Sequence, residues 1–228
     1  MDFILDGFIR AFFLLANGDP ETFAAIGVTL HAAAYSMAAG LLIGVPAGFV
    51  LGGLDFPGRR TLRLVVDTLL ALPTVFIGLM VYAFLTRRGP LGEWGLLFSV
   101  HGMAIGQTIL ALPVITALTA SAVESTDRGL RTTVLSLGAG RRQLLLTTLW
   151  EGRFGILAGA VTACGRVLTE VGIAMMVGGN IKWHTRTITT AIALETGKGE
   201  FAMGIALGLV LLAIAFAVNL SVSVLRRS

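Results

Sequence analysis

Five stretches of this chain are predominantly apolar over about 20 residues or more, the length that an α-helix needs to cross the hydrocarbon core of a bilayer. They cover residues 24–52, 64–86, 95–123, 154–178 and 201–225. Charged residues make up only 13% of the chain, against roughly 25% in a typical soluble domain, which is too few to cover a water-facing surface. We therefore predict an all-α membrane protein with five transmembrane helices in a single domain, residues 1–228, rather than a soluble enzyme.

The first 16 residues predict a different kind of helix. Their apolar residues recur at helical spacing but are interrupted by Asp2, Asp6 and Arg10, and the polar run 17–20 then breaks the pattern. An amphipathic helix of this kind lies on the membrane surface rather than across it. We predict an interfacial helix over residues 1–16, in contact with membrane lipid.

The basic residues predict the orientation of the chain. If the five stretches cross the membrane in turn, ten arginines fall in one set of loops: Arg59, Arg60, Arg63, Arg128, Arg131, Arg141, Arg142, Arg153, Arg226 and Arg227. Six basic residues fall in the other set: Arg10, Arg87, Arg88, Lys182, Arg186 and Lys198. Because basic loops remain on the cytoplasmic side, we expect the N-terminus outside and the C-terminus inside. This distribution explains the positive net charge without a nucleic-acid partner.

Small residues and prolines are regularly placed in these stretches. Glycine recurs at every fourth position of the first stretch, at Gly40, Gly44, Gly48 and Gly52. This spacing puts the glycines on one face and lets a second helix approach closely. Each of the first three stretches also contains a proline that favours a kink, namely Pro46, Pro73 and Pro113. Such helices suit a transporter or channel, although irregular packing would explain them equally well.

The segment 124–153 is neither a span nor a polar linker. Its apolar residues are spaced for two short amphipathic helices, with a break at residues 138–140 where glycine permits a turn. Flanking arginines make this pair of helices suitable either as a cytoplasmic docking element or as a hairpin on lipid headgroups. The chain contains no Gly-x-x-x-x-Gly-Lys-Ser/Thr phosphate loop, so a partner would have to hydrolyse any ATP.

Several motifs resemble those of ATP-binding-cassette (ABC) importer permeases. Residues 135–143 are similar to the coupling-helix signature of these permeases when Gly138 is aligned, although residues 132–134 depart from its usual Glu-Ala-Ala. Four further stretches resemble the molybdate, tungstate and sulfate permeases, and their tungstate branch most of all: 151–156, 165–172, 175–180 and 189–199. The resemblance implies the type I ABC importer permease fold and an oxyanion substrate, with tungstate favoured over molybdate or sulfate.

The resemblance also implies partners and a docking site. The permease would form a homodimer in the cell membrane of a prokaryote, with cytosolic ABC ATPase subunits and an extracytoplasmic oxyanion-binding protein, and with no cofactor of its own. The residues expected to couple it to the ATPase are Thr132, Thr133, Leu137, Gly138, Ala139, Arg141 and Arg142.

Candidate gate or path residues lie at the fourth stretch: Arg166, Glu170, Met175, Met176 and Asn180. Arg166 and Glu170 are four residues apart, on one face of a helix. They would either line a wet path or form an ion pair that locks two helices together. Met175 and Met176 would either pack or border a gate. The three histidines lack the spacing of metal ligands, so we predict no metal site.

Two other classes of protein remain as alternatives. An intramembrane enzyme would need clustered Asp or His inside the spans, and Asp67 and Glu170 alone do not form such a cluster. A channel or secondary transporter would not need the docking helices, and the inverted repeat of many secondary transporters is not apparent. The outer loops are nearly balanced in charge, so they offer no positive funnel for an anion. This balance favours a separate binding protein as the selective component.

Overall fold

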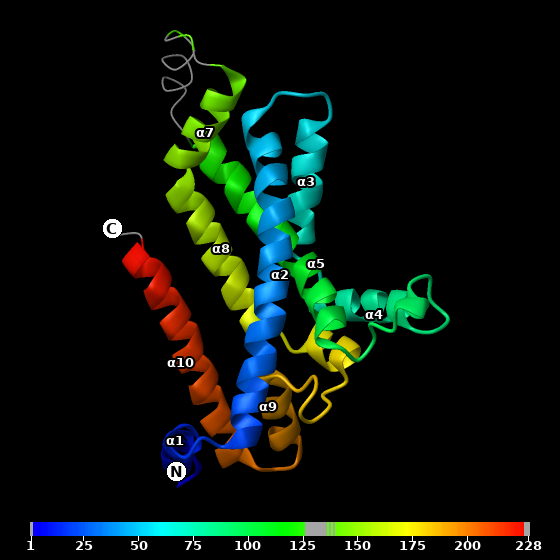
Figure 1. Cartoon of the computed structure of the whole chain (residues 1–228), viewed down its shortest axis with the longest axis vertical. Coiled ribbons are helices and arrows are strands. Elements are labelled where there is room, and N and C mark those ends of the chain that lie inside the picture. The colour runs from blue at the N-terminus through cyan, green and yellow to red at the C-terminus, as the bar shows by residue number, and fades with distance from the viewer. Residues whose placement is uncertain (1, 126–135, 137, 139, 226–228) are drawn as a thin grey trace. The chain divides into compact units, whose positions relative to one another are not determined.

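The computed structural model describes residues 2–125, 136, 138 and 140–225. Throughout these ranges the regular structure is helical, and they contain no strand. In chain order (Figure 1) the elements are α1 (Asp2–Ala16), α2 (Pro20–Gly53), α3 (Arg59–Leu69), α4 (Thr74–Leu85), the 3₁₀-helix η1 (Gly92–Trp94), α5 (Val100–Glu124), α7 (Arg141–Glu151), α8 (Arg153–Leu168), the π-helix η2 (Ala174–Gly178), α9 (Ile188–Gly197) and α10 (Phe201–Leu225). The prediction of an all-α protein is confirmed over the described residues.

Within the described part of the chain, three helices are long and apolar enough to cross a membrane: α2, α5 and residues Phe201–Leu220 of α10. The number rises to five if two bent pairs, α3 with α4 and Gln143–Glu151 with α8, each count as one span. The predicted stretch 64–86 is therefore not one continuous helix. Pro73 stands directly before α4, and its ring disfavours a helical conformation in the residue that precedes it.

Other predicted boundaries also change. Pro46 and Pro113 lie inside the continuous helices α2 and α5, so neither interrupts its helix as Pro73 does. The predicted stretch 154–178 is interrupted, because α8 ends at Leu168 and the π-helix η2 follows separately. Of the two short helices predicted in the segment 124–153, the second corresponds in position to α7, and most of the first lies outside the described residues.

The contacts divide the chain into two compact units. One consists of residues 1–36, 73–110 and 165–228, and the other of residues 37–72 and 111–164. Helices α2, α5 and α8 each contribute residues to both units. The first unit contains the candidate gate residues, and the second contains α3 and α7.

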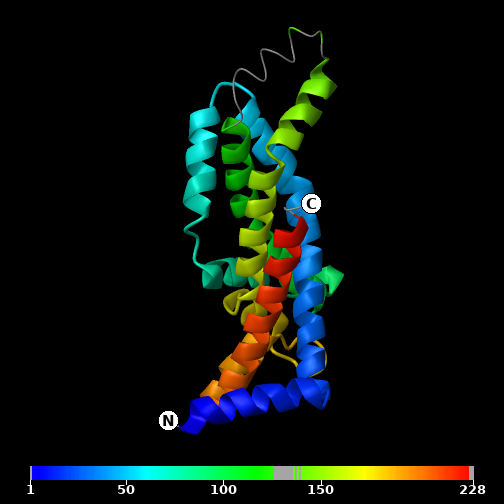
Figure 2. The same ribbon diagram turned by 90° about the vertical axis from the view of Figure 1, so that its left-hand side faces the viewer.

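In the first unit, α1 and α9 both pack against α10. Figure 2 shows α1 running across α10 rather than along it. Gly7 permits this close approach, since a Cβ at that position would lie 2.5 Å from Cγ2 of Ile205. The opposite side of α1 exposes large apolar side chains, including Phe8 (57%), Phe12 (72%) and Phe13 (56%). The helix predicted over residues 1–16 is thus present over residues 2–16, and its place at the membrane surface stays a prediction.

In the second unit, α2 packs closely on α5 along the glycines. A Cβ on Gly44 would lie 2.9 Å from the Ile115 side chain, and a Cβ on Gly48 would lie 2.6 Å from the carbonyl oxygen of Thr116. The predicted close helix contact is therefore confirmed. Of the most apolar part of α5, 72% is buried, against 28% in α2 and in α10, so α5 is the most buried of these three helices.

Candidate functional site

Glu170 joins the end of α8 to the start of α9. The residue is only 6% exposed. Its carboxylate accepts a hydrogen bond from the backbone N–H of Ile173 (3.1 Å), and its carbonyl oxygen accepts one from the hydroxyl of Thr189 (2.8 Å). Helix α8 ends at Leu168, so Glu170 lies in the turn that follows this helix, and its pairing with Arg166 stays a prediction. The observed role of the Glu170 carboxylate is to bind the backbone of its own turn.

The two predicted gate methionines lie in the π-helix η2, but in different surroundings. Met175 is 42% exposed. Met176 faces α4, where a Cβ on Gly78 would lie 3.2 Å from the Met176 sulfur and 3.2 Å from Cα of Ile173. Glycine at position 78 therefore allows α4 to lie close to η2. Since π-helical turns are frequent at functional sites, Met175 is the methionine that is available to line a path, whereas Met176 packs.

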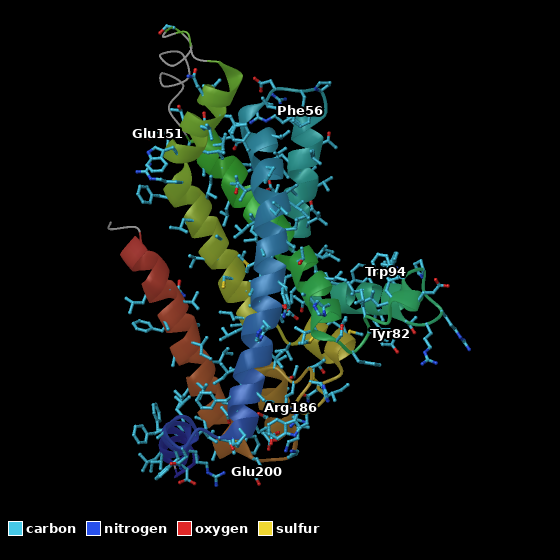
Figure 3. All side chains as sticks on the ribbon, in the orientation of Figure 1. Phe56, Tyr82, Trp94, Glu151, Arg186 and Glu200 are labelled. Carbon is cyan, nitrogen blue, oxygen red and sulfur yellow. The ribbon has the colours of Figure 1, made fainter. Side chains whose placement is uncertain are left out.

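Asn180 is held in a left-handed conformation by a charged cluster. Its φ is 50°, which is uncommon for a residue other than glycine. The Asn180 Oδ1 accepts a hydrogen bond from Nε of Arg186 (3.2 Å). Arg186 also pairs with Glu21 at the start of α2, and Nζ of Lys182 lies 2.6 Å from Oε2 of Glu21. Arg186 lies on the loop that leads into α9 (Figure 3), so this loop is anchored to α2.

A group of buried threonines surrounds the start of α9. The hydroxyl of Thr187 accepts a hydrogen bond from the N–H of Thr190 (3.2 Å), and the hydroxyl of Thr29 accepts one from the N–H of Ile188 (3.0 Å). Both bonds satisfy N–H groups that lack partners within the helix. Thr29 and Thr187 lie outside the motifs that the sequence offers. The available signal was the Thr-Ile-Thr-Thr run before an apolar helix, which is typical of a helix start.

The structure covers only part of the predicted docking segment. Thr132, Thr133, Leu137 and Ala139 lie outside the described residues. Gly138 has a φ of 79°, a conformation that favours glycine and agrees with the predicted turn. Arg141 and Arg142 are the first two residues of α7. The N–H of Gly140, directly before this helix, donates to Oε1 of Gln143 (2.9 Å).

The last residue of α5, Glu124, is held by two arginines of α3. Nη2 of Arg59 lies 2.8 Å from Oε1 of Glu124, and Nη1 of Arg63 lies 3.7 Å from Oε2 of the same carboxylate. Arg63 also donates a hydrogen bond to the hydroxyl of Ser121 (2.8 Å). From the sequence, these arginines predict only the orientation of the chain in the membrane. No local spacing could have revealed the contact, because Arg59 and Glu124 are 65 residues apart.

The chain is similar in sequence to permeases of oxyanion transport systems. It is 48% identical over 228 residues, 100% of this chain and 95% of the relative, to the tungstate uptake system permease protein TupB of Campylobacter jejuni. A protein of the same name from Peptoclostridium acidaminophilum is 37% identical over 219 residues, 96% of each chain. The molybdenum transport system permease protein ModB of Escherichia coli K12 is 31% identical over 192 residues, 80% of this chain and 83% of the relative.

The fold is similar to that of a solved importer. The inward-facing MetNI methionine ABC transporter matches with a TM-score of 0.73 and 20% sequence identity, over 92% of this chain and 97% of that chain. This similarity confirms the type I ABC importer permease fold. Residues 44–228 match the family described as "Binding-protein-dependent transport system inner membrane component". The chain therefore belongs to the family of binding-protein-dependent transport system inner membrane components.

Proposed function

We propose that this chain is the permease subunit of an ATP-driven importer for tungstate. The observation that carries the proposal is the 48% identity, over the full length of the chain, to a protein named as a tungstate uptake system permease. The stretches 175–180 and 189–199, which resemble tungstate permeases, support the same substrate. The chain acts as a transport subunit rather than an enzyme, and a partner ATPase hydrolyses the ATP.

Molybdate is the second candidate substrate, and sulfate follows it. The E. coli molybdenum permease is 31% identical to this chain, and the sulfate permease CysW of Synechocystis is 29% identical over 211 residues. Because the outer loops have no excess of positive charge, we assign the discrimination between these anions to an extracytoplasmic binding protein.

The proposed assembly contains two copies of this chain, two cytosolic ATPase subunits and the binding protein. The ten-to-six division of basic residues supports an external N-terminus and a cytoplasmic segment 124–153. The exposed apolar face of α1 supports contact with lipid, because large apolar side chains are unfavourable in water. A reporter that is active only in the cytosol should work when fused after Arg142 and fail when fused before Met1, and the reverse pattern would reject this orientation.

We assign two functional regions within this assembly. The ATPase docks on residues 132–142 and α7, and the residues proposed to mediate docking are Thr132, Thr133, Leu137, Gly138, Ala139, Arg141 and Arg142. The path or gate is proposed to involve Arg166, Glu170, Met175, Met176 and Asn180. The hydrogen bonds of Glu170 and Asn180 support a positioning role for these two residues, and the exposure of Met175 supports contact with the path.

Uptake in whole cells tests the substrate. The chain should be expressed with its ATPase and binding protein in a host that lacks uptake systems for tungstate, molybdate and sulfate. We expect ATP-dependent accumulation of isotopically enriched tungstate, measured by mass spectrometry. An excess of ordinary tungstate should suppress this accumulation, and the same excess of molybdate should suppress it less. Cells that lack only this chain are the control. Stronger competition by molybdate or sulfate would assign the second or third substrate, and accumulation without this chain would reject the proposed function.

A further inference from the structure

We propose that Glu124 transmits movement of the ATPase-docking segment to α2 and α3 through Arg59 and Arg63. This inference rests on the proposed function, because it assigns a positioning role within ATP-driven transport. All the residues involved belong to the second compact unit.

The described part of the docking segment, α7, is connected to the end of α5 through α8. Glu124 is the final residue of α5. Helix α8 follows α7 and packs on α5 through glycines: a Cβ on Gly155 would lie 2.6 Å from Cβ of Ala122, and a Cβ on Gly159 would lie 2.9 Å from Cβ of Leu118. Close-packed interfaces of this kind transmit displacement rather than absorb it. A force applied to α7 therefore reaches the end of α5 through α8.

Arg59 connects the end of α5 to the end of α2. Its Nε donates to the carbonyl oxygen of Leu51 (2.7 Å), and its Nη2 donates both to the carbonyl oxygen of Gly52 (3.1 Å) and to Glu124 (2.8 Å). The last carbonyls of a helix have no partner within the helix, and the planar guanidinium group can bond several acceptors at once. A single side chain thus joins α2, α3 and α5.

Arg63 offers the Glu124 carboxylate a second hydrogen-bond donor. Its Nη1 is buried and makes no hydrogen bond within the part of the chain that the structure describes. The nearest carboxylate oxygen, Oε2 of Glu124, lies at 3.7 Å, beyond hydrogen-bond distance. A small displacement of Glu124 toward Arg63 would form that bond while stretching the bond to Arg59. An open cavity of about 630 Å³ leaves room for this displacement, and its lining consists of Asp55, Phe56, Gly58, Arg59, Arg60, Thr61, Arg63 and Glu124.

The contact is poorly suited to a purely stabilising role. The side chains of Arg59, Arg63 and Glu124 are 28%, 25% and 39% exposed, and partly exposed ion pairs contribute little to stability. What distinguishes this contact is its position, because it is where the predicted docking segment leaves α5. An element with two alternative arrangements at such a position can couple two distant sites.

The test uses the complete transporter, with ATPase and binding protein, reconstituted in liposomes. Glu124→Gln keeps the size of the side chain but removes its charge. We expect normal assembly and ATP hydrolysis, with tungstate uptake per ATP reduced about fivefold or more, the lower end of typical coupling between sites. Asp55→Asn is the matched control, because Asp55 pairs with Arg59 at 2.8 Å but is 89% exposed and makes no contact with α5 that the structure records. The Asp55→Asn variant should take up as much tungstate per ATP as the unaltered complex.

A second measurement does not depend on the transported anion. Spin labels placed at the exposed positions Leu64 on α3 and Leu146 on α7, with Cys164→Ser, report the distance between these helices. We expect ATP binding to change this distance in the otherwise unaltered complex and not in Glu124→Gln. Normal uptake per ATP in Glu124→Gln, equal losses in Glu124→Gln and Asp55→Asn, or failure of Glu124→Gln to assemble would each overturn the proposal. Absence of tungstate uptake in the unaltered complex would instead count against the proposed function.

Discussion

Replacing Gly48 by alanine tests the contact between α2 and α5. The added Cβ would lie 2.6 Å from the carbonyl oxygen of Thr116 and 2.6 Å from Cβ of Thr119. The backbone of α5 cannot rotate out of the way as the end of a flexible side chain can. Gly48→Ala should therefore force the two helices apart and destabilise the protein.

The expected loss follows from two opposing effects. Over-packing a well-packed interface typically costs about 1–3 kcal/mol, whereas alanine gains about 0.5–1 kcal/mol over glycine within a helix. Because the Gly48 contact is with backbone, we take the upper part of the first range. The net loss is then about 2 kcal/mol, or roughly thirtyfold in the folding equilibrium. Gly52→Ala should behave similarly, since its Cβ would lie 2.5 Å from the carbonyl oxygen of Ala120.

The same helix supplies graded controls. Gly27 has no atom within 4 Å of an added Cβ, whereas a Cβ on Gly40 would lie 3.0 Å from the end of the Ile115 side chain and 3.6 Å from Cβ of Ala111. Gly27→Ala should be neutral or stabilising, and Gly40→Ala should be intermediate. The assay is reversible unfolding in detergent, followed by circular dichroism. Equal stability of Gly48→Ala and Gly27→Ala would refute the close contact between α2 and α5.

Three further predictions concern the local contacts. Glu170→Ala leaves the buried N–H of Ile173 without its acceptor and should cost about 1–3 kcal/mol of unfolding free energy in detergent. Glu170→Gln keeps an oxygen that can accept this hydrogen bond, so it should cost less. Equal losses in the two variants would contradict the role of this bond. Thr187→Val removes the cap of α9 and should cost about 1 kcal/mol in the same assay, whereas Thr187→Ser should be close to neutral. Gly138→Leu places a side chain at a φ of 79°, which costs about 1–2 kcal/mol locally, and it should lower uptake per ATP without reducing the amount of protein in the membrane. Gly140→Leu is the control, because Gly140 has a φ of −72°. Equal effects of the two changes would argue against a specific turn at Gly138.

Features that depend on nearby residues could be predicted from the sequence. The length of the apolar stretches predicted α2, α5 and α10, because crossing a bilayer requires a minimum run of apolar residues. The spacing of residues 1–16 predicted α1, and the glycine repeat predicted the face of α2 that contacts another helix. In each case the physical cause, helical periodicity or the span of a bilayer, operates within one segment of the chain.

Features that depend on distant residues were decided only by the tertiary structure. The sequence places Glu170 within a helical stretch, whereas α8 ends at Leu168 and the carboxylate of Glu170 bonds the backbone N–H of Ile173 in the turn that follows. Met175 and Met176 look equivalent in the sequence, yet only Met176 faces Gly78 on α4.

The contact of Arg59 with Glu124 shows the same limit. In the sequence, Arg59 and Glu124 each look like an ordinary polar residue at the end of an apolar stretch. Which carboxylate an arginine binds depends on how helices far apart in the sequence pack together, and that packing leaves no local periodicity for a reader of the sequence to detect.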